Sequence, residues 1–275
     1  MRTIVAPTDF SDTSINAVNY AAELASVIGA DLSLIYVYTL PLTFSEVPIP
    51  PFSIDEQIAA AENHLNVIKE RLQEQTKKKI KIRTQISQGE IVSEIDNYCT
   101  TLNPYAVVMG VETRGNVERL LLGGKTLTAM RRLHWPLIVV PPEIKFTAIR
   151  KIGLACDFRN VMKTVPVNEI KQMVEEFHAE LHVLHVSTEI GNSFSYQTVQ
   201  ESGGLHQVIG ELKPKYHFIN GTDIEENVNE FAKKNDLDLL IVIPKKHNLV
   251  NKIFTHSHSK RLVLHTHIPV MAIHE

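Results

Sequence analysis

The stretch from Met109 to Gly124, MGVETRGNVERLLLGG, joins two runs of different character. The preceding YAVVMG is apolar, like a buried strand, and the following KTLTAMRRL is amphipathic, like a helix. A glycine-bearing loop between a strand and a helix can bind phosphate, because unpaired backbone N–H groups and the helix dipole both favour an anion there. The loop is therefore a candidate phosphate site, and the alternative is a turn that holds no ligand.

Sequence signatures of catalysis are weak by comparison. The fragment GGKT lacks the earlier glycine that a Walker A loop needs at its spacing, and no Gly-x-Ser-x-Gly elbow occurs. A slow ATPase would need a carboxylate that binds metal near the phosphates, and Glu112 and Glu118, the two carboxylates in the loop, are placed there by no motif. We therefore predict no catalytic residue, although the sequence leaves open whether the chain is an enzyme.

Composition excludes several classes of protein. The chain has 275 residues, of which 44% are apolar, and a formal charge of −3, which does not favour nucleic-acid binding. The basic run Lys77–Arg83 alternates with isoleucine, so it is predicted to start a strand with one solvated face. No apolar run is long enough to cross a membrane, and two distant cysteines form no disulfide framework. These features predict a cytoplasmic protein without a membrane partner.

The sequence contains the same unit twice. A β-branched run ends in Asp9 in the first copy and in Asp157 in the second, and each aspartate is followed by phenylalanine. The run ADLSLIYV corresponds to AELHVLHV, and HWPLIVVP corresponds to THIPVMAIH. A repeat of this length indicates a duplicated domain and not a solenoid.

Alternating strands and amphipathic helices in each copy predict parallel sheets covered on both faces. The fold class is therefore α/β, with two tandem doubly wound domains of five parallel strands each, over residues 1–143 and 147–275. Two long loops are expected after the second strand of each copy, over residues 39–53 and 189–204.

The openings IVAPTDFSD, the loop VVMG…RLLLGG and the closing HWPLIVVP together resemble the universal stress protein family in its tandem form. The resemblance covers nearly the whole chain. It implies an adenine nucleotide alpha hydrolase-like fold and association through the last strand of each domain. Members of that family that bind ATP carry Gly-x-x-Gly, nine further residues, and then Gly-Ser or Gly-Thr, and other members lack this motif.

In the first copy the motif is incomplete. Gly110 and Gly123 stand at the family spacing, but Thr113 replaces the second glycine and Gly124 replaces the hydroxyl residue. The resemblance places Asp9 against the adenosine part of a ligand and Val37 in the base pocket. The full set of candidate binding residues is Pro7, Thr8, Asp9, Val37, Met109, Gly110, Thr113, Gly123, Gly124 and Lys125.

These departures change what the loop is expected to bind. A β-branched Thr113 is strained if the backbone there needs positive φ, and Gly124 offers no side-chain hydroxyl to a phosphate oxygen. Lys125 adds a cation at the helix start, and Arg114 and Arg119 are further candidates for phosphate contact. The candidate ligands are ATP, ADP or AMP, with Mg²⁺ expected only as a companion of the nucleotide.

The second copy departs further from the motif. Its corresponding segment, VIPKKHNLVNKIFTHSHSKRL, contains no glycine, with Pro244 and His256 near the two glycine positions. We predict that this domain does not bind ATP as the family does, although Lys245 and Lys246 leave anion binding open.

Two further groups of residues have alternative interpretations. His256, His258, His265 and His267 form a histidine-rich segment that is either a loose metal site or a set of structural positions, and the alignment of His267 with His134 favours the latter. Cys156 is either a reactive thiol or a buried inert side chain.

The sequence thus predicts a stress-response binding or signalling protein with at most one adenine-nucleotide site, in the first domain. The alternatives are a slow metal-dependent ATPase and an ATP-independent scaffold that binds protein or lipid through the Pro-rich loop over residues 39–53. The two last strands are expected to pair within the chain or to form a homodimer.

Overall fold

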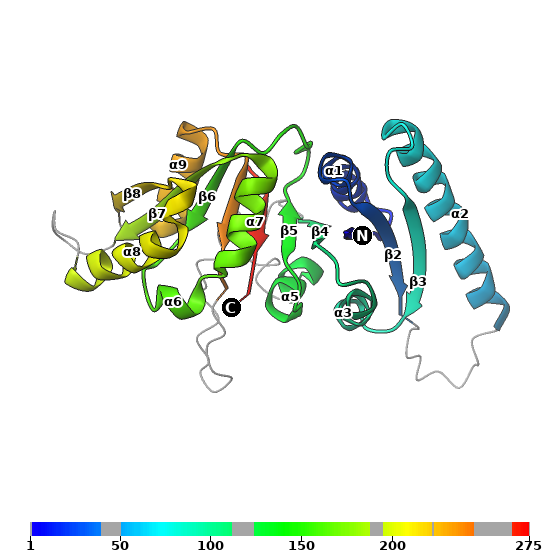
Figure 1. Ribbon diagram of the computed structural model, residues 1–275. Helices are drawn as coiled ribbons and strands as arrows, with labels where there is room; N and C mark the ends of the chain where they lie inside the picture. Colours follow the sequence, from blue (N-terminus) through cyan, green and yellow to red (C-terminus); the bar gives the residue numbers. More distant parts are fainter. Residues whose placement is uncertain are drawn as a thin grey trace, which may run out of the picture. The chain divides into compact units, whose positions relative to one another are not determined.

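The computed structural model describes residues 2–39, 51–111, 124–187, 195–221, 223–244 and 266–274. These residues form two compact units. Unit 1 contains the described residues 2–110 and 124–146, and unit 2 contains those from Thr147 onward together with Val111. Each unit is an α/β fold with a parallel sheet (Figure 1).

Unit 1 alternates strands and helices along the chain. Its elements are β1 (Thr3–Pro7), α1 (Asp12–Ile28), β2 (Asp31–Tyr38), α2 (Pro51–Gln75), β3 (Ile82–Gln88), α3 (Ile91–Leu102), β4 (Ala106–Gly110), α5 (Lys125–Arg132) and β5 (Leu137–Val140). The strands lie side by side in the order β3-β2-β1-β4-β5, all parallel. The order reverses between β1 and β4, which is where ligands bind in doubly wound folds.

Unit 2 repeats this plan. Its elements are β6 (Lys151–Ala155), α6 (Val161–Thr164), α7 (Val167–Phe177), β7 (Glu180–Ser187), α8 (Tyr196–Ile209), the 3₁₀ turn η1 (Gly210–Leu212), β8 (Lys215–Asn220), α9 (Ile224–Lys234), β9 (Leu239–Val242) and β10 (Val270–Ala272). Its strand order is β10-β9-β6-β7-β8, again parallel. The two tandem five-stranded α/β sheets predicted from the repeat are therefore confirmed.

The central strands of unit 1 are apolar on both faces because helices cover both. Ile4, Val5 and Ala6 of β1 have no exposed surface, and all four residues of β5 are buried. Helices α1 and α2 share one face, where Arg71 donates to Asn19 at 2.9 Å. Helices α3 and α5 pack together on the other (Figure 1). This packing fixes the strand ends from which the site is built.

Three sequence predictions need correction. The loop expected over 189–204 is wrong from Tyr196 onward, because α8 begins there, capped by Ser195, whose hydroxyl accepts from the backbone N–H of Thr198 at 3.1 Å. The glycine pair 203–204 made this segment resemble a loop, but the buried Leu205 and Ile209 hold the helix against the unit. The loop expected over 39–53 likewise ends before Pro51, where α2 begins.

The third correction concerns the basic run. The strand begins only at Ile82, and Lys77 and Lys78 instead lie in a turn with φ of 51° and 57°. The turn forms where α2 ends, so only the last two residues of the run lie in β3.

None of the helices in the described ranges is both long and apolar enough to span a bilayer.

Candidate nucleotide site

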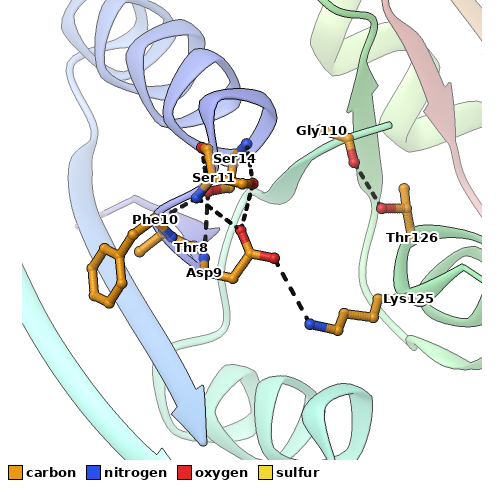
Figure 2. Close-up of polar contacts among 8 residues, drawn as sticks. All are labelled: Thr8, Asp9, Phe10, Ser11, Ser14, Gly110, Lys125 and Thr126. Atoms are coloured by element: carbon orange, nitrogen blue, oxygen red, sulfur yellow. Dashed lines mark hydrogen bonds and ion pairs between the residues drawn. The ribbon is translucent and has the colours of Figure 1, made fainter. Parts of the chain in front are cut away.

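The carboxyl end of β1 is organised by a network of hydroxyl groups. Ser11 caps α1, and its hydroxyl accepts from the N–H of Ser14 at 3.3 Å. The buried Thr8 lies with its hydroxyl oxygen 3.1 Å from that of Ser14. The Asp9 carboxylate accepts from the Ser11 hydroxyl at 2.6 Å and from the Ser11 N–H at 3.2 Å (Figure 2). Asp9 is thereby held at the strand end.

The electrostatics of Asp9 favour the charged carboxylate. Partial burial opposes ionisation, but the hydrogen bonds from Ser11 and Ser14 and the charge of Lys125 outweigh it, so the pKa of Asp9 lies below its ordinary value. Asp9 is therefore an ionised hydrogen-bond acceptor at neutral pH.

The start of α5 faces this carboxylate across the edge of the sheet. Lys125 Nζ lies 3.8 Å from Asp9 Oδ2, and both side chains are about half exposed (Figure 2). The Thr126 hydroxyl donates to the Gly110 carbonyl at 2.7 Å and so ties the helix start to the end of β4. The first N–H groups of a helix have no intrahelical partner, and Gly124 at the N-cap supplies no side-chain cap. The start of α5 therefore presents backbone N–H groups beside the Lys125 cation, which is the chemistry that favours an anion.

Gly110 has a second reason to be glycine. A Cβ placed there would lie 2.5 Å from the Thr13 carbonyl oxygen and 2.7 Å from Thr13 Cγ2. The first turn of α1 thus passes so close to β4 that only glycine fits. Gly124 is different: its φ is −52°, and a Cβ there would meet no atom within 4 Å.

The structure brings together most of the predicted residues. Pro7, Thr8 and Asp9 end β1, Met109 and Gly110 end β4, and Gly124 and Lys125 begin α5. Val37 lies near the end of β2, at the same edge because the strands are parallel. Met109 is only 7% exposed, so its side chain belongs to the buried core. Thr113 and Gly123 lie outside the described residues.

Sequence reasoning missed three residues of this site. Ser11, Ser14 and Thr126 fix Asp9 and the helix start, but none belongs to the glycine motif. The repeated hydroxyls of DFSDTS were the signal available, since Ser and Asp before an apolar helical pattern mark an N-cap.

The corresponding strand end in unit 2 carries different side chains. Asp157 accepts from the N–H of Arg159 at 3.1 Å, and Cys156 is 8% exposed. Phe158 has φ of 49°, like Phe10 with 65°, so the duplicated turn keeps its shape while the hydroxyl residue at Thr8 becomes Cys156. The segment with Lys245, Lys246 and His256 lies outside the described residues. Within the described ranges no group of three or more His, Cys, Asp or Glu side chains is placed to hold a metal.

Each unit is a doubly wound parallel α/β domain, and in unit 1 Asp9, Lys125 and the start of α5 lie at the switch point of the sheet. The model of the Universal stress protein family matches residues 1–141 and 148–274. The chain therefore belongs to the universal stress protein family and carries two copies of its domain.

Individual relatives agree with this assignment. Universal stress protein MJ0531 of Methanocaldococcus jannaschii is 30% identical over 145 residues, which cover 50% of this chain and 80% of that protein. A universal stress protein from Archaeoglobus fulgidus matches with a TM-score of 0.74 at 20% identity, covering 99% of this chain and 96% of that one. A putative universal stress protein from Pseudomonas aeruginosa matches with a TM-score of 0.65 at 12% identity, covering 100% and 93%. The structural matches establish the fold.

Proposed function

We propose that unit 1 binds one adenine nucleotide at the carboxyl edge of its sheet, and that the chain acts as a stress-response binding or signalling module. The observation that carries this proposal is the approach of Lys125 to Asp9 at 3.8 Å, at a helix start with no side-chain cap. Asp9, with Pro7, Thr8 and Val37, would bind the adenosine part. The first turn of α5 and Lys125 would bind phosphate.

The first experiment is to purify the chain natively, denature it and identify any released nucleotide by mass spectrometry. Titrations with AMP, ADP and ATP then compare the wild type with Lys125→Ala, and Lys79→Ala serves as control because Lys79 is exposed and precedes β3 at the opposite edge. Loss of one charged contact should weaken binding about tenfold or more in Lys125→Ala alone.

The alternatives give different results. Hydrolysis that needs a divalent metal and is lost in Asp9→Ala would favour the slow ATPase. No carried nucleotide and no binding at millimolar ligand would overturn the proposal and leave an ATP-independent interaction module.

We also propose that the last strands, β5 and β10, are pairing edges, within the chain or in a homodimer. Each is the final strand in the order of its own unit. Light scattering gives the oligomeric mass, and hydrogen exchange over 137–140 and 270–272 reports whether the strand edges are paired. Rapid exchange at both edges would contradict the pairing.

Residues 1–143 and 147–275 remain the proposed domains, and a cytoplasmic location remains a prediction.

A further inference from the structure

Two histidines of unit 2 lie against each other on neighbouring strands. His182 Nδ1 on β7 is 3.1 Å from His217 Nε2 on β8, and the ring planes differ by 8° with centroids 5.1 Å apart. His182 is 5% exposed, and Phe231 of α9 covers the pair, with its centroid 4.5 Å from that of His217. Two imidazoles in this contact are joined by a single proton between the facing nitrogens.

The charges around the pair act in both directions, because the Glu180 carboxylate favours a protonated His182 whereas Lys215 and Lys151 oppose it. Lys215 of β8 binds Glu180 of β7 at 2.6 Å, so this carboxylate is already paired with a cation. His182 Nε2 is 3.4 Å from Glu180 Oε2, beyond a good hydrogen bond, and no other hydrogen-bond partner reaches it among the described residues. Lys151 of β6 adds a further positive charge.

Helix α9 places the ring of Phe231 against both histidines. That ring is uncharged, and the buried carboxylate of the helix, Glu225, is six residues away, about 9 Å along the helix axis. Burial is the largest cause that lowers the pKa of both His182 and His217 below the ordinary value; the positive charge of Lys215 adds to it, and the Glu180 carboxylate opposes it at His182 without reversing it.

The first unit lacks this chemistry at the same positions. By strand register, Ser33 and Gln85 of unit 1 correspond to His182 and His217, and Asp31 and Arg83 correspond to Glu180 and Lys215. The cross-strand ion pair is kept, with Asp31 and Arg83 3.4 Å apart. Where unit 2 has its histidines, the Ser33 hydroxyl instead contacts the Tyr98 hydroxyl at 2.7 Å, and Tyr98 occupies the helix position of Phe231. At these matched positions only unit 2 therefore carries histidines.

We propose that the His182–His217 pair is a pH-sensitive element of unit 2, in which protonation of both imidazoles in mildly acidic solution puts an N–H on each facing nitrogen, breaks the contact and loosens the β7–β8 edge. Strand β8 is the outer strand of its sheet, so it has one neighbour to hold it. The direction of the pH effect follows from the linkage between proton binding and stability. Just below the ordinary histidine pKa of about 6.5, the two histidines bind fewer protons in the native state than in the unfolded state. Their contribution to the stability of unit 2 is therefore fully present above that pH and is lost as the pH falls.

The test is hydrogen exchange of the β8 amides at pH 7.5 and 5.5, corrected for intrinsic rates. For each imidazole that stays neutral in the native state, the equilibrium constant for local opening of β8 should be about tenfold larger at pH 5.5 than at pH 7.5. His217→Gln should reduce this ratio, and the triple change His182→Ser, His217→Gln, Phe231→Tyr, which copies unit 1, should abolish it. His178→Asn is the control, because His178 ends α7 outside the pair, and asparagine tolerates its φ of 48°.

Two results would overturn the proposal. One is equal protection of β8 at both pH values in the wild type, and the other is a full pH response in His217→Gln. If the triple variant does not fold, the histidine ring protons of the wild type are titrated by NMR instead. Both rings should titrate below about pH 6.5 as a coupled pair, and independent titration at the ordinary value would refute the idea.

Discussion

The substitution Gly124→Ser should strengthen nucleotide binding by unit 1. Gly124 is the N-cap of α5, with φ of −52° and ψ of 143°, a conformation that serine adopts readily. A Cβ at this position would meet no atom within 4 Å, so the added side chain causes no clash. The hydroxyl would also be free to cap the helix or to reach a bound phosphate.

The size of the effect follows from these two roles. As a helix cap, serine improves on glycine by only a few tenths of a kcal/mol, so thermal stability should hardly change. A hydrogen bond to a charged phosphate oxygen contributes about 1.5–3 kcal/mol, which corresponds to about tenfold to about a hundredfold in affinity. The binding gain should therefore be large while the stability gain is small.

Isothermal titration of ADP and ATP into both proteins measures this change. Gly203→Ser is the matched control, because a Cβ at Gly203 on α8 also meets nothing within 4 Å, yet the residue lies in unit 2. An affinity of Gly124→Ser within twofold of the wild type, in a folded protein, would refute the placement of phosphate at the start of α5.

Other predictions concern the scaffold of the site. Gly110→Ala should lower the free energy of unfolding by about 1–3 kcal/mol, because its Cβ would press on the Thr13 carbonyl; a urea midpoint that does not move would contradict the close approach. Ser11→Ala should cost about 1 kcal/mol through loss of the α1 cap, measured in the same way. That variant should also raise the pKa of Asp9, since its strongest donor is lost; carboxyl NMR titration of both proteins checks this, and an unchanged midpoint would count against the network. Because the native pKa of Asp9 is lowered, its contribution to stability is present above the unfolded value of about 3.9 and is lost as pH falls through the native value.

The sequence was informative where the signal is local. Alternation of strand and helix patterns and the repeated Asp-Phe after a β-branched run predicted two parallel sheets and placed Asp9 at a strand end. Helix α2 was missed although Ala61, Leu65, Ile68 and Leu72 form a buried stripe at helical spacing, and α8 was assigned to a loop because it contains two glycines.

Contacts between distant segments could not be predicted in this way. The proximity of Lys125 to Asp9 joins residues more than a hundred positions apart, and the pairing of His182 with His217 depends on strand register. Gly110 was interpreted as a loop glycine, but its tight contact with Thr13 is a packing constraint that no single-sequence pattern reveals.

The central claim is that unit 1 holds one adenine nucleotide between Asp9 and the start of α5. The most direct measurement is calorimetric titration of nucleotide into the native full-length chain after any carried ligand is removed. The account predicts one site per chain, weakened in Lys125→Ala and unchanged in Lys79→Ala. Two sites per chain, no heat at millimolar ligand, or equal affinity in both lysine variants would contradict it.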